Sequence, residues 1–374
     1  MKKRLRVILI GYYVKKQAIT FDGQSGRTRA LFSSLKEMDL NLKLIDTDQY
    51  QRNPIALAIA SIFALFANDV IVVCLARKGS KSLLPPLIKI NSFFKRRIIY
   101  IPIGLSIFAD LDSHQRENDL NNMLKNVDEI AFTPAHNIFS NALKKTSQIF
   151  VETETIKRLA ARMYNLDSQK IGVLYNYKDE KLINYFGGEA NHDGNLHLYF
   201  DSRLCEEKGL KDLVDAIILY NSSERNKCIY LDIYGMLHDF YEREFNELKT
   251  QFGYYIRYLG TYNPYEFKGL FSKYDAMVFP TKHLEGFPGN ILIAYFSGIP
   301  IISTNFGSAA ELIKDGLTGY IYNGTREDLF RVFDSVNEEG LFSLRNNCYS
   351  LAKEFTSQAI EIKLKRFLFE GICE

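Results

Sequence analysis

The stretch HLEGFPGNILIAYFSGIPII, residues 283–302, joins a glycine-rich turn to an apolar segment and then to a second turn. Its single carboxylate, Glu285, precedes Gly-Phe-Pro-Gly, and the apolar segment at 289–297 has the length of a short helix. Gly-Ile-Pro then leads into the β-branched run 300–304, and another apolar run, 276–280, ends just before the stretch. The pattern is strand, turn, helix, strand, which predicts neighbouring parallel strands in an α/β fold.

The same alternation of strand and helix extends along most of the chain. Helical spacing is found at 26–38, 114–126 and 154–164. Apolar strands that alternate with amphipathic helices indicate parallel sheets covered on both faces. The runs that predict strands lie at 6–11, 42–46, 70–76, 98–104, 129–132, 148–152 and 170–176, and in a second series at 196–201, 229–235, 255–260, 276–280, 300–304 and 319–322.

A polar, glycine-rich passage at 187–195 separates the two series. We therefore expect an α/β protein of two doubly wound, Rossmann-like domains that face each other across a cleft. The predicted domains are 1–170 and 171–355, and we expect the final segment, 356–374, to be a helix that crosses back to the first domain.

Composition is that of a globular chain of 374 residues, with 47% hydrophobic and 24% charged residues. The longest apolar run, 55–67, is too short to span a bilayer, and the first residues do not resemble a signal peptide. Five widely spaced cysteines without a Cys-x-x-Cys pair suggest reduced thiols rather than a disulfide framework or a zinc site. We therefore expect a cytoplasmic protein.

Charge is distributed unevenly along the chain. Residues 1–170 contain 26 Lys and Arg against 15 Asp and Glu, whereas 171–374 contain 21 against 29. A basic half beside an acidic half suggests that only the first faces an anionic partner. The alternative is drift in surface composition.

The segment LYFDSRLCEEKGLKDLVDAI, residues 198–217, carries two cations between a strand and a helix. Arg203 follows the strand, and Lys208 precedes the helix. A guanidinium fork, an ammonium group and a helix amino end together suit a diphosphate. The alternative is that both cations pair with Glu206 and Glu207 on a solvated turn.

The turn of the opening stretch occupies the equivalent place after a later strand. Gly286 and Gly289 allow backbone N–H groups to approach a ligand, and the amino end of the following helix attracts an anion. Because Glu285 does not favour a bare phosphate, we expect it to accept hydrogen bonds from hydroxyl groups. A phosphate with an adjoining polyol is a sugar nucleotide. The alternative is an ordinary turn with an exposed Glu.

Near the amino end, TFDGQSGRTRAL offers Gly23 and Gly26 just before a predicted helix. They form a possible phosphate-approach loop. They do not form the dinucleotide-binding G-x-G-x-x-G, which directly follows a first strand. Asp46, at the end of the second predicted strand, keeps a dehydrogenase as an alternative.

These segments, in this order, resemble the retaining, nucleotide-sugar-dependent glycosyltransferases of family 4, which have the GT-B fold. The resemblance is strongest over about 196–335 and includes R-x4-K-G, EGFPGN and SGIPIISTNFGSAAELIKDGLTGYIY. It implies transfer of a sugar from a nucleoside diphosphate sugar, UDP- or GDP-linked, with retention at the anomeric carbon. It implies no cofactor and no bound metal.

The resemblance also implies roles for particular residues. Arg203 and Lys208 would hold the diphosphate, and Glu285 would hold sugar hydroxyls. The remaining donor-binding residues implied are Gly23, Gly26, Gly235, Thr261, Tyr262, Gly286, Phe287, Pro288 and Gly289.

One departure from the family concerns a second glutamate, eight positions after the first, that binds the ribose. Ile293 stands there. The ribose contact would then move to Glu311 or to backbone, or donor affinity would be lower. The departure leaves two alternatives open, a non-catalytic binding or scaffold protein that retained the cleft and a sugar-nucleotide epimerase on the same fold.

The basic first domain bears on the acceptor. The segments 2–6, 55–67 and 91–100 combine basic, apolar and aromatic residues that suit an anionic membrane surface. A glycan or polyprenyl-diphosphate-linked acceptor, in capsule or O-antigen synthesis at the inner membrane face, is the expectation. The alternative is that 55–67 is a core helix and Arg96 and Arg97 flank a strand. No nucleic-acid-binding module is recognisable.

Overall fold

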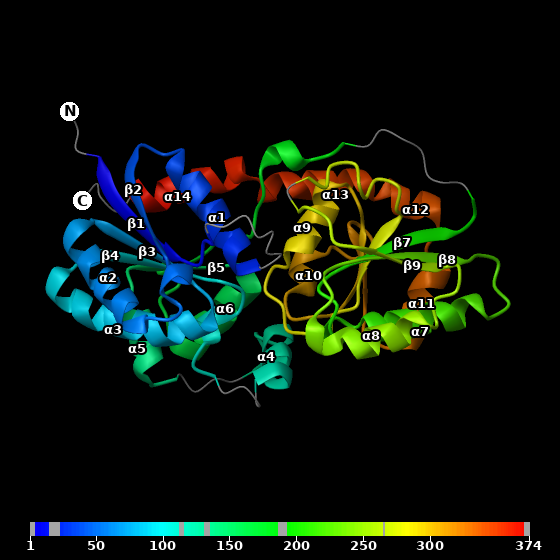
Figure 1. The fold of residues 1–374 in the computed structure, drawn as a ribbon, viewed down its shortest axis with the longest axis horizontal. Helices are drawn as coiled ribbons and strands as arrows, with labels where there is room; N and C mark the ends of the chain where they lie inside the picture. The colour runs from blue at the N-terminus through cyan, green and yellow to red at the C-terminus, as the bar shows by residue number, and fades with distance from the viewer. Residues whose placement is uncertain are drawn as a thin grey trace. The chain divides into compact units, whose positions relative to one another are not determined.

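The computed structural model describes residues 4–14, 23–111, 116–130, 135–185, 193–264 and 266–369. The chain forms two compact units, one made of Met1–Tyr177, Glu285–Phe287 and Ser357–Glu374 and the other of Lys178–Leu284 and Pro288–Thr356. Each unit contains one parallel sheet with helices on both faces (Figure 1). The predicted α/β class with two doubly wound sheets is confirmed.

The first unit is built on a sheet whose described strands have the order β2-β1-β3-β4-β5-β6, all parallel. Helix α1 packs against the carboxyl-terminal helix α14, and α2 packs against α3. The strands are β1 (Leu5–Gly11), β2 (Leu40–Asp46), β3 (Val70–Leu75), β4 (Arg97–Pro102), β5 (Gln148–Val151) and β6 (Ile171–Val173), and the helices are α1 (Gly23–Lys36), α2 (Pro54–Ala67), α3 (Arg77–Phe94), α4 (Arg116–Lys125), α5 (Ile138–Lys145), α6 (Glu154–Tyr164) and α14 (Ser357–Phe369).

The second unit has the strand order β12-β11-β10-β7-β8-β9, again all parallel. The strands are β7 (Leu196–Asp201), β8 (Ile229–Tyr234), β9 (Ile256–Gly260), β10 (Ala276–Phe279), β11 (Ile301–Thr304) and β12 (Gly319–Tyr322), and the helices are α7 (Leu210–Asn221), α8 (Glu242–Lys249), α9 (Gly289–Phe296), α10 (Ala309–Leu312), α11 (Arg326–Ser335), α12 (Glu338–Ser343) and α13 (Arg345–Ala352).

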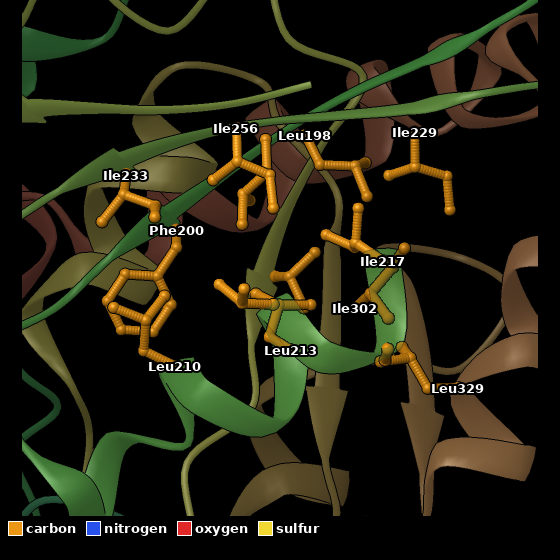
Figure 2. Packing of buried hydrophobic residues seen from close by; sticks show 14 of the residues in the cluster. Leu198, Phe200, Leu210, Leu213, Ile217, Ile229, Ile233, Ile256, Ile302 and Leu329 are labelled. Carbon is orange, nitrogen blue, oxygen red and sulfur yellow. The ribbon is translucent and has the colours of Figure 1, made fainter. Parts of the chain in front are cut away.

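The apolar core of the second unit covers one face of its central strands. That face of β7 and β8 packs against α7, and side chains from β9, β11 and α11 belong to the same cluster (Figure 2). The alternate residues of β7 and β8, which include Asp201 and Asp232, point to the other face of the sheet. The labelled members are Leu198, Phe200, Leu210, Leu213, Ile217, Ile229, Ile233, Ile256, Ile302 and Leu329.

Two expectations about secondary structure need correction. Glu129 and Ile130 do not form a strand, and the rest of the predicted strand 129–132 lies outside the described residues. The expected helix at 26–38 begins three residues earlier, at Gly23. The signal at 129–132 was a short apolar run without turn residues, and such runs do not distinguish a strand from other buried backbone.

Candidate functional site

The second sheet contains a point at which its strand order reverses. From the central pair β7 and β10, the chain continues outward to β8 and β9 on one side and to β11 and β12 on the other. In open α/β sheets, ligands bind beyond the carboxyl ends of the strands at this point. The turns that follow β7 and β10 are the two turns predicted to contact a sugar nucleotide.

The turn after β7 presents one exposed and one buried cation. The Arg203 side chain is exposed, and no hydrogen bond or ion pair of its guanidinium is present within the described part of the chain. Lys208 is only 6% exposed and ends a short 3-10 helix just before α7. No ion pair of Arg203 with Glu206 or Glu207 forms among the described residues, so the guanidinium is accessible to an anionic ligand.

Backbone contacts join this turn to the turn after β10. The Glu207 carbonyl accepts hydrogen bonds from the backbone N–H groups of Lys282 (2.8 Å) and His283 (3.2 Å). Gly209 has φ +72°, and a Cβ there would lie 2.1 Å from the Pro280 carbonyl oxygen. Only glycine allows this close approach at a positive φ. The two turns are therefore held as one piece.

Helix α9 begins beside this junction. Pro288 precedes it with an extended backbone, and Gly289 is exposed, so that a Cβ at this position would meet no atom within 4 Å. The Asn290 side chain donates to the carbonyl of Asp201 at the end of β7. The fold thus gives no steric reason for glycine at 289, whereas an approaching ligand would.

The remaining donor-binding residues of the predicted turn after β10 differ in exposure. Glu285 is half-buried, whereas Gly286 and Phe287 are buried. Ile293, which stands where the family's second glutamate is expected, is 4% exposed and packs inside the unit. Glu311, its suggested substitute, is half-buried on the short helix α10, which follows β11.

Gly235 and Tyr262, both predicted to bind the donor, have structural contacts. A Cβ on Gly235, at φ +144°, would lie 1.7 Å from the Ser202 carbonyl oxygen, so glycine is required for the turns after β7 and β8 to pack. The Tyr262 hydroxyl donates to the Asp201 carboxylate at 2.6 Å. Thr261 is exposed. Of these three residues, Thr261 has the side chain most accessible to a ligand.

Asp201 and Lys178 were not chosen as site residues from the sequence. Asp201 is buried, and this burial raises its pKa to about 6, although the Tyr262 hydrogen bond and the Lys178 charge act in the opposite direction. Burial likewise lowers the pKa of Lys178 to about 8. Its ammonium group lies 5.9 Å from the ring centre of Phe267. The sequence feature that could have indicated Asp201 is that this carboxylate ends the apolar strand LHLYFD.

In the first unit, the two glycines of the predicted phosphate loop lie within a helix. Gly23 and Gly26 both belong to the first turn of α1, and the residues just before them lie outside the described part of the chain. The expectation of a loop containing both glycines is therefore wrong. A Cβ on Gly26 would have no neighbour within 4 Å, so the fold does not itself require glycine there.

Asp46 has a local structural role. It is 3% exposed, and its Oδ1 accepts hydrogen bonds from the backbone N–H groups of Tyr13 (3.0 Å) and Asp48 (3.1 Å). The bond from Tyr13 holds the segment after β1 against the end of β2, and the bond from Asp48 caps the short 3-10 helix that follows β2. They account for a carboxylate at this position without the nucleotide ribose that a dehydrogenase would place there.

Metal-ligand clusters and membrane-spanning helices would indicate other kinds of site. No group of three or more His, Cys, Asp or Glu side chains is arranged to hold a metal ion in these parts of the chain. Within the same ranges, no helix combines the length and the apolar content needed to cross a bilayer.

Comparison with known proteins gives one family match. Residues 195–334 match the family described as glycosyl transferases group 1. This segment contains both turns and every strand of the second sheet. No curated protein sequence matches the chain.

Solved structures resemble the chain over nearly its whole length. HepE of Anabaena, in complex with UDP, has a TM-score of 0.69 and 15% identity, covering 97% of this chain and 99% of its own. Sucrose-phosphate synthase from Thermosynechococcus elongatus has a TM-score of 0.69 and 13% identity, with coverage of 98% and 100%. The lipopolysaccharide outer core galactosyltransferase WaaB, in its apo form, has a TM-score of 0.65 and 16% identity, with coverage of 98% and 100%.

At these identities the solved structures establish the fold, which is that of the GT-B glycosyltransferases. The predicted resemblance to this group is thereby confirmed. The family match supports the coarser functional expectation, a glycosyltransferase.

Proposed function

We propose that the protein transfers a sugar, with retention, from a UDP- or GDP-linked donor to a glycan or polyprenyl-diphosphate-linked acceptor. The pathway we propose is synthesis of a surface polysaccharide such as capsule or O-antigen. One observation carries the proposal. The two turns predicted to bind the donor follow the central strands β7 and β10, where the strand order reverses, and the Glu207 carbonyl joins them.

Donor activation follows from the charges on these turns. The bond from the anomeric carbon to the diphosphate breaks as the acceptor oxygen forms its bond to that carbon on the same face. The acceptor proton passes to a phosphate oxygen. Arg203 and Lys208 stabilise the negative charge that develops on the leaving diphosphate, and preorganised cations stabilise that transition state more than the ground state.

The other donor contacts are divided between hydroxyl groups and phosphates. Glu285 accepts hydrogen bonds from the sugar, and Glu311 takes the ribose contact that Ile293 does not make. Backbone groups of Gly286–Gly289 contact the sugar and phosphate, Gly235 contributes to donor binding, and Thr261 and Tyr262 lie near the base. HepE has been solved with UDP and with UDP-glucose, which favours a UDP-linked donor here.

The acceptor belongs, in this proposal, to the first unit. Gly23 and Gly26 begin α1 there, and an amino-terminal helix end offers backbone N–H groups to an anion. A lipid-linked acceptor places the protein in the cytoplasm at the inner membrane face.

The direct test measures release of nucleoside diphosphate from UDP- and GDP-sugars, with and without a bacterial membrane fraction that contains lipid-linked glycans. We expect release that depends on the membrane fraction and a product with the donor's anomeric configuration by NMR. Release of nucleotide without acceptor would instead indicate the epimerase. Binding of the donor without any release would indicate the non-catalytic alternative, and an inverted product would exclude retention.

A further inference from the structure

Helix α2 exposes an apolar face on the first unit. Only Ser61, Ala64 and Leu65 of this helix are buried. The large side chains on the other side recur every three or four positions, which places them on a single stripe. They are Ile55 (72% exposed), Ile59 (49%), Phe63 (66%) and Phe66 (56%).

The composition of α2 is unusual for a helix with an open face. Its sequence, PIALAIASIFALFA, contains no charged residue. A helix that is apolar all around is normally buried, and contiguous apolar patches on a protein surface mark interaction sites. The expectation that 55–67 is a core helix therefore holds only for the side that faces the sheet.

The carboxyl end of α3 extends the apolar face. The Phe66 and Phe94 rings lie 4.3 Å apart between centres, so the ends of α2 and α3 meet (Figure 1). Phe93, next to this contact, is 85% exposed. We call the surface formed by Ile55, Ile59, Phe63, Phe66 and Phe93 the α2–α3 face.

The segment of the chain that contains this face is strongly basic. Residues 52–97 contain eight Lys and Arg but only one acidic residue, Asp69, which forms an ion pair with Arg6. Arg52 just before α2, Lys89 on α3 and Lys95 at the end of α3 are exposed. An apolar face with cations at its edge is complementary to an anionic lipid surface, where acyl chains take the apolar groups and headgroups the charges.

Other basic residues that the sequence suggested for membrane contact have partners within the protein. Arg96 donates to the Leu65 carbonyl, and Arg97 donates to the carbonyls of Phe367 and Leu368. Arg4 forms an ion pair with Asp39, and residues 1–3 lie outside the described part of the chain. The cations at the edge of the α2–α3 face are therefore different from those at 2–6 and 96–97.

We propose that the α2–α3 face docks the protein on an anionic bilayer, with the phenylalanine rings in the interfacial layer and Arg52, Lys89 and Lys95 at the headgroups. This inference names the surface for the proposed peripheral location. It does not depend on sugar transfer, because docking is measurable without donor or acceptor.

The test is sedimentation of the full chain with vesicles of phosphatidylglycerol and phosphatidylcholine, against vesicles of phosphatidylcholine alone. Phe63→Ser combined with Phe93→Ser removes apolar contact, and we expect about a tenfold loss of binding to anionic vesicles. The matched control combines Phe240→Ser with Ile362→Ser, two side chains that are 72% and 70% exposed elsewhere. We expect the control to bind like wild type.

A second pair of variants tests the charges. Arg52→Gln with Lys89→Gln should lower binding to anionic vesicles on the order of tenfold at low salt. Lys249→Gln with Lys268→Gln removes the same charge from exposed positions in the second unit. These substitutions should change vesicle binding only slightly, because salt screens the attraction of distant charges. UDP binding, measured on each variant, checks that the protein remains folded.

Three results would overturn the proposal. Wild type could remain in the supernatant with anionic vesicles at low salt. The control pairs could lose as much binding as the pairs on the face. Light scattering could show a dimer that Phe63→Ser with Phe93→Ser converts to a monomer while vesicle binding is absent, which would assign the face to a second copy of the chain.

Discussion

Two buried aspartates on neighbouring strands of the second sheet have opposite environments. Asp232 lies within β8 and is 4% exposed, and Asp201 ends β7 and is 8% exposed. Burial raises the pKa of Asp232, but hydrogen bonds from Arg257 and Tyr274 and the nearby cations bring it below its usual value. Burial also raises the pKa of Asp201, to about 6, and there the opposing contacts are too weak to reverse the shift.

The difference lies in the partners that each strand position offers. Asp232 accepts two hydrogen bonds from the Arg257 guanidinium, at 2.8 Å each, and one from Tyr274 at 2.6 Å. Among the described residues, the Asp201 carboxylate accepts one hydrogen bond, from Tyr262, and has the charge of Lys178 nearby. Buried charges whose partners offset the cost of burial are typical of structural ion pairs. Groups with strongly shifted pKa values cluster at functional sites. We infer that β8 carries a structural ion pair and β7 ends in the site.

The largest predicted difference is between Arg203, in the turn after β7, and Arg257, which pairs with Asp232. Arg203→Ala should lower turnover by about two to three powers of ten, because a preorganised donor to the leaving group is lost. Arg257→Ala, on β9, should leave turnover within about threefold of wild type. Rates of nucleotide release from the best donor measure both effects. Equal losses of turnover in the two variants would contradict the assignment of Arg203 to the donor site and of Arg257 to a structural ion pair.

The pH dependence of stability should have opposite signs for the two carboxyl groups. Ionised Asp201 opposes folding, so its contribution improves as pH falls through about 6, by on the order of 2–3 kcal/mol. Asp232 has a lowered pKa, so its contribution is present near neutral pH and is lost as pH falls through that folded-state pKa.

Denaturant unfolding of Asp201→Asn and of wild type, across the acid range, measures this difference. The variant should be the more stable protein at neutral pH, and its advantage should disappear at about pH 4. A variant that is less stable than wild type at neutral pH would show that Asp201 is as well compensated as Asp232.

Stability should depend more on Arg257 than on Arg203. Removal of the Arg257 side chain leaves a buried carboxylate with fewer partners, so Arg257→Ala should lower the free energy of unfolding by about 1–3 kcal/mol. Arg203 is exposed, so Arg203→Ala should change the free energy of unfolding by less than about 0.5 kcal/mol. Urea unfolding of both variants and of wild type measures these changes. An Arg257→Ala variant with the same free energy of unfolding as wild type would contradict the prediction.

The smallest predicted effect concerns the hydrogen bond from Tyr262 to the Asp201 carboxylate. Tyr262→Phe should raise the pKa of Asp201 further, because the hydrogen bond favours the ionised form. The cost should be about 1 kcal/mol in unfolding free energy at neutral pH. NMR titration of the carboxyl group follows the pKa, and a lowered value in the variant would contradict this account of Asp201.

The sequence predicted the alternation of strands and helices because parallel strands need apolar residues on both faces. The run 196–201 was predicted with the bounds that β7 has. Strand order and the junction of turns were not predictable, because the Glu207 carbonyl and the Gly209–Pro280 approach join residues far apart in sequence. The buried state of Asp201 also depends on tertiary packing, which the six residues of β7 do not reveal.

The start of α1 was not predicted correctly from the sequence. Gly23 and Gly26 suggested a loop because glycine disfavours helix interiors, yet both lie in the first turn of α1. The N–H groups of the first turn have no acceptors within the helix. Capping and hydrogen-bond partners outside the helix therefore influence which residues occur there, in addition to helix propensity. The exposed face of α2 was equally ambiguous, since an uncharged apolar run fits a core helix and a docking helix alike.

Calorimetric titration with UDP, GDP, ADP and CMP tests the central claim, that the joined turns after β7 and β10 form a donor site. We expect one nucleoside diphosphate to bind selectively to wild type and to Arg257→Ala. Arg203→Ala should lose at least about tenfold in affinity, as expected for one charge-assisted hydrogen bond. Equal affinity in Arg203→Ala and wild type, or no binding of any diphosphate at millimolar concentration, would contradict it.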